Sequence, residues 1–301
     1  MENQNGMNQN GMDQVEESQV EKSGERAAAS DEAVRVTDVP PVILAVNTSS
    51  PQIDLAITRG DITLSTLTAS RVEQHSRTLF THLTALLDQA ALTIDEVDLF
   101  AVVTGPGSFT GLRVGMSAVK GLAATNRRPI YGVDLLELKI RGLLQVATAL
   151  VVCDSGRGEV FCGLRQLHSD GRCVSLHQDC FGAPAISLRQ ALTDNPPRNL
   201  LITGNGVGRA AVELQSIAED HGISFLPDMT NLTRGANLAG IAGLPTDPRG
   251  AGWQIAPDPE PIAITLARTV HLIVRSKSWG RGAVCQPFYI RPSDAELNWK
   301  R

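Results

Sequence analysis

The strongest constraint on the fold is an order of predicted elements that occurs twice along the chain. The first half opens with three short strands, expected to be antiparallel, at 42–46, 53–57 and 62–64. A helix over 79–90 and a continuously apolar strand at 99–103 follow. Because an uninterrupted apolar run is typical of a strand buried on both faces, 99–103 is expected to be central and parallel.

This half continues with a helix over 112–123, a strand at 129–133 and a third helix, for which Asp134 is placed as the N-cap. Three strands followed by alternating helices and strands are the order of a ribonuclease H-like domain. The pattern predicts that the first half of the chain folds in this way.

The pattern then restarts, with strands at 149–153, 159–164 and 173–176, a helix over 185–192 and a strand at 200–203. Two such halves predict an α/β protein with duplicated ribonuclease H-like domains, the actin- and hexokinase-like (ASKHA) architecture.

The expected organisation is a disordered acidic tail at 1–39, an N-terminal domain at 40–147 and a C-terminal domain at 148–301. Within the last, 227–260 is rich in Pro, Gly and Asp, which predicts a loop-dominated segment with at most one short helix. A final helix is expected at 262–274.

Charge is concentrated in the tail, where residues 1–39 hold nine acidic and three basic side chains and no aromatic residue. Such a segment buries too little apolar surface to offset the entropy of ordering. The rest of the chain is close to neutral, which argues against a nucleic-acid binder that acts through bulk charge. No apolar run is long enough for a transmembrane helix and the N-terminus is polar, so a soluble, cytoplasmic protein is expected.

The cysteines fit neither a zinc site nor an exported disulfide framework. Their number is odd and no two form a C-x-x-C pair. They are expected to be reduced thiols in strands or in the core. The five are Cys153, Cys162, Cys173, Cys180 and Cys285.

The most informative segment is the string TGPGSFTGLRVG at 104–115, which follows an apolar strand and opens a helix. Backbone N–H groups at such a helix start can hold an anion, and Gly105 and Gly107 allow close approach of the backbone. Thr110 is placed as the N-cap. A tight, closely packed turn is an equal alternative, because no Gly-Lys-Ser/Thr ending follows and Ser108 lacks the glycines of a nucleophile elbow.

Two further glycine patterns have alternative meanings. Gly111 and Gly115 remove side-chain bulk from one helix face. Such a pair usually allows close packing within the fold, and the alternative is close approach of a helix from another subunit. The run GNGVG at 204–208 follows a strand and is favoured as a helix-opening turn over a nucleotide loop.

Few residues are suited to metal binding. His75 and His82 lie seven apart on one helix, whereas two ligands from one helix need a spacing of four, so no metal site is expected. Asn47 ends the first strand, where kinases of this duplicated fold place a carboxylate. An amide there is a poorer Mg²⁺ ligand and cannot act as a base.

These motifs resemble the TsaB (YeaZ) family, subunits of the bacterial complex that makes threonylcarbamoyladenosine next to the tRNA anticodon. The resemblance covers about 41–301 and rests above all on the glycine–aromatic string at 104–115. Weaker matches follow in the right order: ILAVNTS at 43–49, EQHS at 73–76, DSGRGEVF at 154–161 and PFYIR at 287–291.

The resemblance implies a non-catalytic subunit that forms a heterodimer with the paralogous transferase TsaD and reaches tRNA through that complex. It further implies the ATPase TsaE as a partner, no tightly bound cofactor, and ATP or ADP at the contact between subunits. A homodimer in the absence of TsaD is a separate expectation, because a partly apolar helix pair left exposed is a liability. In TsaB-like proteins the partner faces two helices that correspond here to 75–91 and 111–126. The implied partner-binding residues are His75, Leu79, Phe80, Leu83, Gly111, Gly115, Met116 and Val119, and the candidate anion or nucleotide loop comprises Gly105, Gly107, Ser108, Thr110 and Arg113.

Family members usually carry Asp where this chain has Asn47, which weakens the expectation of nucleotide or metal binding by this chain alone. The alternative functions are a small-molecule kinase of the same fold and a hydrolase that uses Ser108. The wider group has also been called glycoproteases. Because no metal pair and no nucleophile–base pair is visible, protease activity is not expected.

Overall fold

The structure is a computed structural model that describes residues 39–70, 75–143, 147–192, 195–226, 252–259 and 261–276. Predictions for the acidic tail, the His75 side chain, Cys285 and the segment 287–291 lie outside the described residues. Among the described helices, none is both long enough and apolar enough to cross a membrane.

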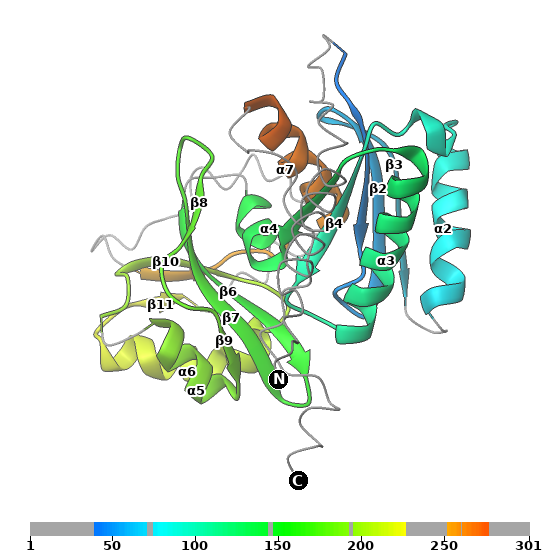
Figure 1. Cartoon of the computed structure of the whole chain (residues 1–301). Helices are drawn as coiled ribbons and strands as arrows, with labels where there is room; N and C mark the ends of the chain where they lie inside the picture. The colour runs from blue at the N-terminus through cyan, green and yellow to red at the C-terminus, as the bar shows by residue number, and fades with distance from the viewer. Residues whose placement is uncertain are drawn as a thin grey trace, which may run out of the picture. The chain divides into compact units, whose positions relative to one another are not determined.

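The first sheet has five strands in the order β3-β2-β1-β4-β5 (Figure 1). β2 pairs antiparallel with both β1 and β3, whereas β4 runs parallel to β1 and β5 parallel to β4. The predicted antiparallel opening and the central parallel strand are therefore confirmed. The strands are β1 (Val42–Asn47), β2 (Gln52–Arg59), β3 (Ile62–Ser70), β4 (Leu99–Gly105) and β5 (Ile130–Asp134).

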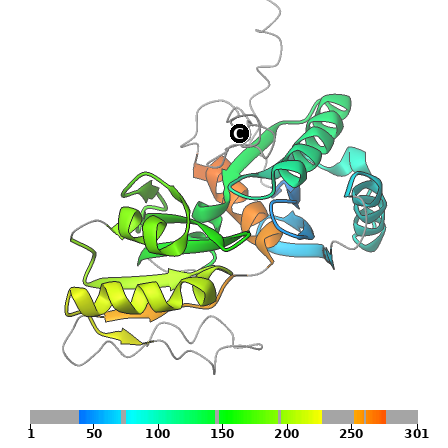
Figure 2. The same ribbon diagram turned by 90° about the horizontal axis from the view of Figure 1, so that it is seen from below.

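The second sheet repeats this order, and Figure 2 shows the molecule from below. The sheet has seven strands in the order β11-β12-β10-β6-β7-β8, and β9 also pairs with β7. β6 and β7 are antiparallel, and β10 and β12 continue in parallel from β6, so these four strands correspond to β1, β2, β4 and β5. The duplicated ribonuclease H-like fold is thereby confirmed. The strands are β6 (Ala147–Gly156), β7 (Glu159–Leu167), β8 (Cys173–Ser175), β9 (Cys180–Gly182), β10 (Asn199–Thr203), β11 (Phe225–Leu226) and β12 (Gly252–Ile255).

Strand β12 corrects the prediction of loop at 252–255, whereas 227–251 and 260 lie outside the described residues. It pairs in parallel with β10 on one side and β11 on the other, and its Trp253 is fully buried. The Trp253 indole N–H donates to the Pro197 carbonyl at 2.8 Å. A strand of four residues is too short to show a period, so tertiary pairing and burial define it.

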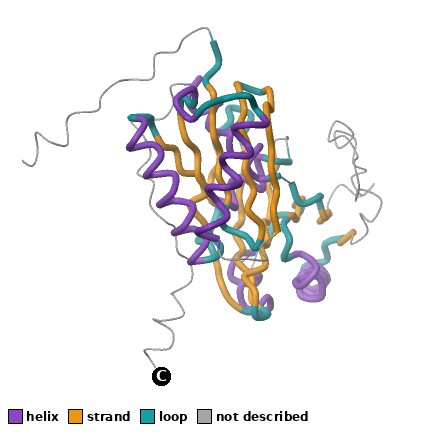
Figure 3. The backbone as a smooth tube through the Cα atoms, turned by 90° about the vertical axis from the view of Figure 1, so that its right-hand side faces the viewer, coloured by secondary structure: helices purple, strands orange, loops and turns teal. Residues whose placement is uncertain are grey.

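Helices cover both faces of the first sheet. α2 and α3 lie on one face (Figure 3), and α4 and α7 lie on the other. Alternation along the strands decides these faces, since Leu44 and Val46 of β1 point to α2 and α3, whereas Ile43 and Ala45 point to α4 and α7. The helices are α2 (His75–Gln89), the short 3₁₀ helix Ile94–Glu96, α3 (Phe109–Asn126), α4 (Leu135–Arg141), α5 (Pro184–Leu192), α6 (Val207–Asp220) and α7 (Ile262–Ser276).

The two sheets share a core on the α4 side. Val151, Cys153 and Phe161 of the second sheet belong to the same buried cluster as Ile43 and Ala45 of β1. The opposite face of the second sheet is covered by α5 and α6. Each sheet therefore has a main core of its own and shares another, and a smaller buried cluster includes Ile140, Leu143 and Ala149.

Helix α7 comes late in the sequence but packs on β1 and β2 of the first sheet. The backbone N–H of Ala263 in its first turn donates to Asp54 Oδ2 of β2 at 2.7 Å. Asp54 is only 2% exposed, and its charge lies where a helix N-terminus favours a negative group. The first sheet is thus completed by a helix from the predicted C-terminal domain.

We expect Asp54→Ala to lower the free energy of unfolding by about 1–3 kcal/mol, because the α7 N-terminus loses a buried acceptor. Urea unfolding measures the change. Asp61→Ala, at an exposed position of the neighbouring turn, is the matched control. Equal unfolding midpoints for the two variants would contradict this role of Asp54.

Candidate functional site

The glycine string packs directly on the loop that follows β1. β1 and β4 are parallel neighbours, so their carboxyl ends meet at one edge of the sheet. The Ser108 N–H donates to the Ser49 carbonyl at 2.7 Å, and a Cβ on Gly107 would collide with that same carbonyl oxygen. Gly105 has φ +127°, which favours glycine. Close approach of the two backbones therefore requires Gly107, and the backbone conformation at 105 favours glycine.

The loop after β1 is ordered by its own side chains. Asn47 is buried, and its Oδ1 accepts from the Ser49 backbone N–H at 3.0 Å and from the Ser49 hydroxyl at 2.6 Å. The Thr48 hydroxyl donates to the Gly111 carbonyl at 2.8 Å. The amide oxygen at the end of β1 thus shapes the turn that follows the strand.

Helix α3 begins two residues earlier than the predicted cap at Thr110 implies. Ser108 is the N-cap, and its hydroxyl accepts from the Gly111 N–H at 3.2 Å. The prediction that Thr110 caps this helix is therefore wrong, since Thr110 lies inside the first turn and is exposed. Arg113, one turn further, stacks over the Phe109 ring at 3.8 Å. The backbone N–H groups of Ser108 and Gly111 are consequently engaged within the chain.

Several residues predicted to face a partner are instead part of the chain's own core. Leu79, Leu83, Met116 and Val119 are at most 4% exposed and pack in the cluster under α2 and α3. These residues form an apolar stripe at helical spacing. Packing against the chain's own sheet produces such a stripe just as packing against a partner does.

Gly115 serves packing within the fold. A Cβ at this position would collide with Thr48 Oγ1. Gly111 is also buried, and its carbonyl accepts from the same Thr48 hydroxyl. Of the two alternatives for this glycine pair, the structure therefore shows close packing of α3 on the β1 loop.

The side chains that α2 and α3 leave exposed form what we call the outer α2–α3 face. Phe80 is the largest apolar group on it, at 51% exposed. The α3 part is built from small and basic residues and contains no acidic one. Among the described side chains, the exposed residues are Phe80, Thr81, Thr84, Asp88 and Gln89 of α2 and Thr110, Arg113, Ser117, Lys120, Gly121, Ala124 and Thr125 of α3.

We expect Gly115→Ala to lower the free energy of unfolding by about 1–3 kcal/mol, because the new methyl group displaces Thr48 and its hydrogen bond. Gly121→Ala is the matched control, since a Cβ there meets nothing within 4 Å. It should raise stability by about 0.5–1 kcal/mol through helix propensity. Urea unfolding of both variants checks the pair, and a neutral effect of Gly115→Ala would contradict the close contact.

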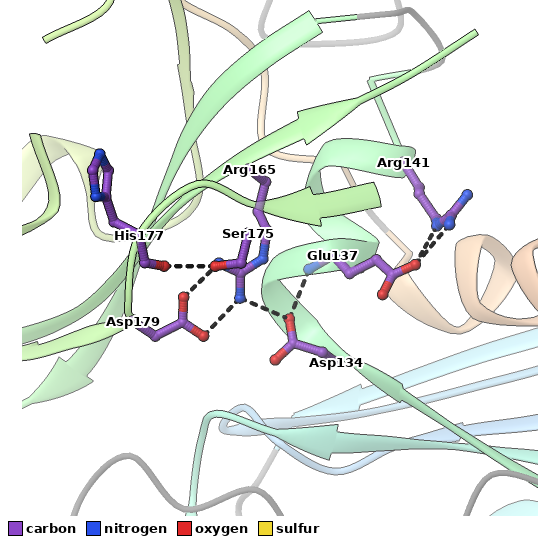
Figure 4. Close-up of polar contacts among 7 residues, drawn as sticks. All are labelled: Asp134, Glu137, Arg141, Arg165, Ser175, His177 and Asp179. Atoms are coloured by element: carbon purple, nitrogen blue, oxygen red, sulfur yellow. Dashed lines mark hydrogen bonds and ion pairs between the residues drawn. The ribbon is translucent and has the colours of Figure 1, made fainter. Parts of the chain in front are cut away.

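A buried ion-pair cluster joins the two halves of the fold (Figure 4). Arg165 of β7 donates to both carboxylate oxygens of Asp179, at 2.5 and 2.6 Å, and lies 3.7 Å from Asp134 Oδ1. Asp134 caps α4 as predicted, accepting from the Glu137 N–H at 2.8 Å. The cap was predictable from the sequence, whereas the Arg165–Asp179 pair was not, because residues paired at such separations leave no periodic signal.

A second buried pair connects the same region. Lys139 of α4 is 3% exposed and lies 2.6 Å from the Asp258 carboxylate, which follows β12. A buried ammonium is costly unless paired, so this ion pair ties α4 to the segment before α7.

Burial raises the pKa of Asp134 to about 6, while Arg165 and the Glu137 N–H act in the opposite direction. Because this pKa is above that of an unfolded aspartate, the folded protein holds the proton more tightly. The stability that Asp134 contributes is thus complete below about pH 4 and is lost as the pH rises through about 6.

Asn at position 134 stays neutral at every pH and keeps a good N-cap. We therefore expect the free energy of unfolding of Asp134→Asn, relative to that of the wild type, to be about 1–2 kcal/mol higher at pH 7 than at pH 4. Urea unfolding at several pH values measures the difference. Asp170→Asn is the control. Hydrogen bonds from Arg172 lower the pKa of Asp170, so this variant should lose stability relative to the wild type as the pH rises, the opposite of Asp134→Asn. Parallel pH curves for wild type and Asp134→Asn would contradict the assignment.

The run at 204–208 is a helix-opening turn. A Cβ on Gly204 would collide with the Val152 carbonyl, and Gly206 packs against the backbone of Cys153 and Asp154. The Asn205 side chain accepts from the Asp154 N–H at 3.0 Å. The favoured alternative of the sequence analysis therefore matches the structure.

The four described cysteines are free thiols on neighbouring strands of the second sheet, as expected. Within the described ranges, no group of three or more His, Cys, Asp or Glu side chains is arranged to hold a metal ion.

Comparison with known proteins agrees with this architecture. The family model for tRNA N6-adenosine threonylcarbamoyltransferase, TsaD, matches residues 64–242, which is more than half of the chain. The chain belongs to the TsaD family. The match spans the outer α2–α3 face, the glycine string and the ion-pair cluster.

Within the TsaD family, the similarity is to the TsaB (YeaZ) type, as the glycine–aromatic string predicted. TsaB of Bacillus subtilis is 30% identical over 125 residues, which cover 41% of this chain and 55% of that protein. The uncharacterised protein Rv3421c of Mycobacterium tuberculosis is 31% identical over 156 residues, covering 50% of this chain and 72% of that one. The structure of YeaZ from Pseudomonas aeruginosa has the same fold, with a TM-score of 0.58 at 20% identity, covering 83% of this chain and all of YeaZ.

Proposed function

We propose that this chain is a TsaB-like, non-catalytic subunit that pairs with a TsaD-type transferase for threonylcarbamoylation of the tRNA adenosine next to the anticodon. The observation that carries the proposal is the outer α2–α3 face within a chain of this family. Phe80 is half exposed on α2, and several of the exposed α3 residues are small, so a partner helix can approach this face closely.

The support beneath this face favours a role in binding. Gly115 and Thr48 hold α3 tightly against the β1 loop. The buried leucines of α2 pack this helix on the same sheet. Two helices fixed in this way present a surface that changes little when a partner binds, and preorganisation of this kind lowers the cost of association.

The basic side chains on this face indicate the chemistry of the partner. Arg113 and Lys120 are exposed on α3, which contains no acidic residue. We propose that the facing helices of the TsaD-type partner carry acidic groups opposite them, because complementary charge speeds association and fixes register.

We propose that ATP or ADP, where it takes part, binds at the contact between subunits. The engagement of the Ser108 and Gly111 N–H groups within the chain supports this, since these donors are not available to a phosphate. The ATPase TsaE as a further partner, a homodimer in the absence of TsaD, contact with tRNA through the complex and a cytoplasmic location belong to the same proposal.

The test is size-exclusion chromatography with light scattering on this protein mixed with the TsaD-type transferase of the same organism. We expect a heterodimer mass for the wild type. Phe80→Asp and Ala124→Arg should weaken the complex at least about tenfold, because each places a charge or bulk at a close contact.

Ile186→Arg is the matched control, since Ile186 is 60% exposed on α5, away from the outer α2–α3 face. Separate elution of the wild type and a folded partner would overturn the proposed pairing. A heterodimer that tolerates both Phe80→Asp and Ala124→Arg would keep the pairing but overturn the choice of surface.

A further inference from the structure

Two cysteines face each other across the ladder between β7 and β9. Cys162 and Cys180 are register partners in this antiparallel pair, so their side chains lie on the same face of the sheet. Directly opposed residues of antiparallel strands have Cα atoms about 4.5–5.5 Å apart. A disulfide spans Cα separations of about 4.4–6.8 Å, so this pair needs no large backbone movement to be bridged.

Contacts on both sides of the pair hold the two strands in this register. The neighbouring register pair, Phe161 and Phe181, has ring centroids 5.1 Å apart. On the other side, Asp179 is bound by the Arg165 guanidinium of β7. The cysteines therefore lie between two fixed cross-strand contacts, and their sulfur atoms are close enough to affect one another's titration.

The two thiols differ in access to solvent. Cys162 is fully buried and its Sγ donates to the Ser187 carbonyl at 3.4 Å. Cys180 is partly exposed and its Sγ donates to the Gln178 carbonyl at 3.4 Å. A small oxidant thus meets Cys180 first, and Cys162 lies behind it as the resolving thiol.

We propose that Cys162 and Cys180 form a reversible disulfide, so that the β7–β9 pair is a thiol–disulfide modification site. Cys180 attacks a low-molecular-weight disulfide such as oxidised glutathione, forming a mixed disulfide and expelling one glutathione thiolate. Cys162 then attacks the Cys180 sulfur and expels the second. Two protein thiols are oxidised, one glutathione disulfide is reduced, and the two protons end on the glutathione thiolates.

The dithiol is the resting form and the reaction is slow at neutral pH. Burial raises the pKa of both thiols, so little of the attacking thiolate is present. The rate of disulfide formation should rise about tenfold per pH unit between pH 7 and pH 8.

The disulfide would lock the position of Asp179, which directly precedes Cys180 and holds Arg165 in the ion-pair cluster with Asp134. The link also closes a short chain loop, which restricts the unfolded state. We expect the melting temperature of the oxidised protein to rise by about 5 °C.

The experiment incubates the full chain in glutathione buffers at pH 8, alkylates the remaining thiols and maps the peptides by mass spectrometry. We expect a linked pair of peptides that carry Cys162 and Cys180. Cys162→Ser should instead accumulate glutathione on Cys180, and Cys180→Ser should form no such link. Cys173→Ser is the matched control and should keep the link.

Three outcomes would overturn the proposal. They are a wild-type protein that keeps glutathione on Cys180 without closing the link, a dominant link between other cysteines, and no oxidation of Cys180 even at pH 9. Each readout is independent of partner binding, so failure here is distinct from failure of the proposed pairing with TsaD.

Discussion

The hydrogen bond from the Ala263 N–H to the Asp54 carboxylate joins residues 209 positions apart and fixes helix α7 on the first sheet. Much else depends on this placement, because α7 and α4 fill the core that the two sheets share. The charges next to that core are paired, as in Lys139 with Asp258 and Arg165 with Asp179. Pairing offsets the cost of taking them out of water, so the two halves are joined by apolar burial and by a few matched polar groups.

The glycine string illustrates how one motif can serve structure at one level and function at another. Its glycines allow the backbone of the α3 start to lie against the β1 loop, where Ser108, Thr48 and Asn47 engage the nearby polar groups. Packing of this kind fixes the position of α3 relative to the first sheet. The function that we propose uses the opposite, exposed face of the same helix. Tight packing of the buried face therefore supports partner recognition by the exposed one.

The second sheet departs from the first by an added edge strand, β11 beside β12, and by a change at its third strand. Where the first sheet has β3 alone, the second has β8 and β9, both paired with β7. The additional short strand brings Cys180 opposite Cys162 and Asp179 beside Arg165. The ion-pair cluster and the cysteine pair that we propose to be redox-active are thus consequences of one local change in a duplicated fold.

The sequence by itself determined the duplicated order of strands and helices, the central strand β4 and the Asp134 cap, because each leaves a local signal in periodicity or residue type. It also determined the family, through a long glycine–aromatic string. Only the tertiary structure decided that Leu79, Leu83, Met116 and Gly115 face inward, because an apolar helix stripe looks alike whether it meets a sheet or a partner. Strand β12 and the contacts of Arg165, Asp179 and Asp54 were likewise decided by folding, since they join residues that are distant along the chain.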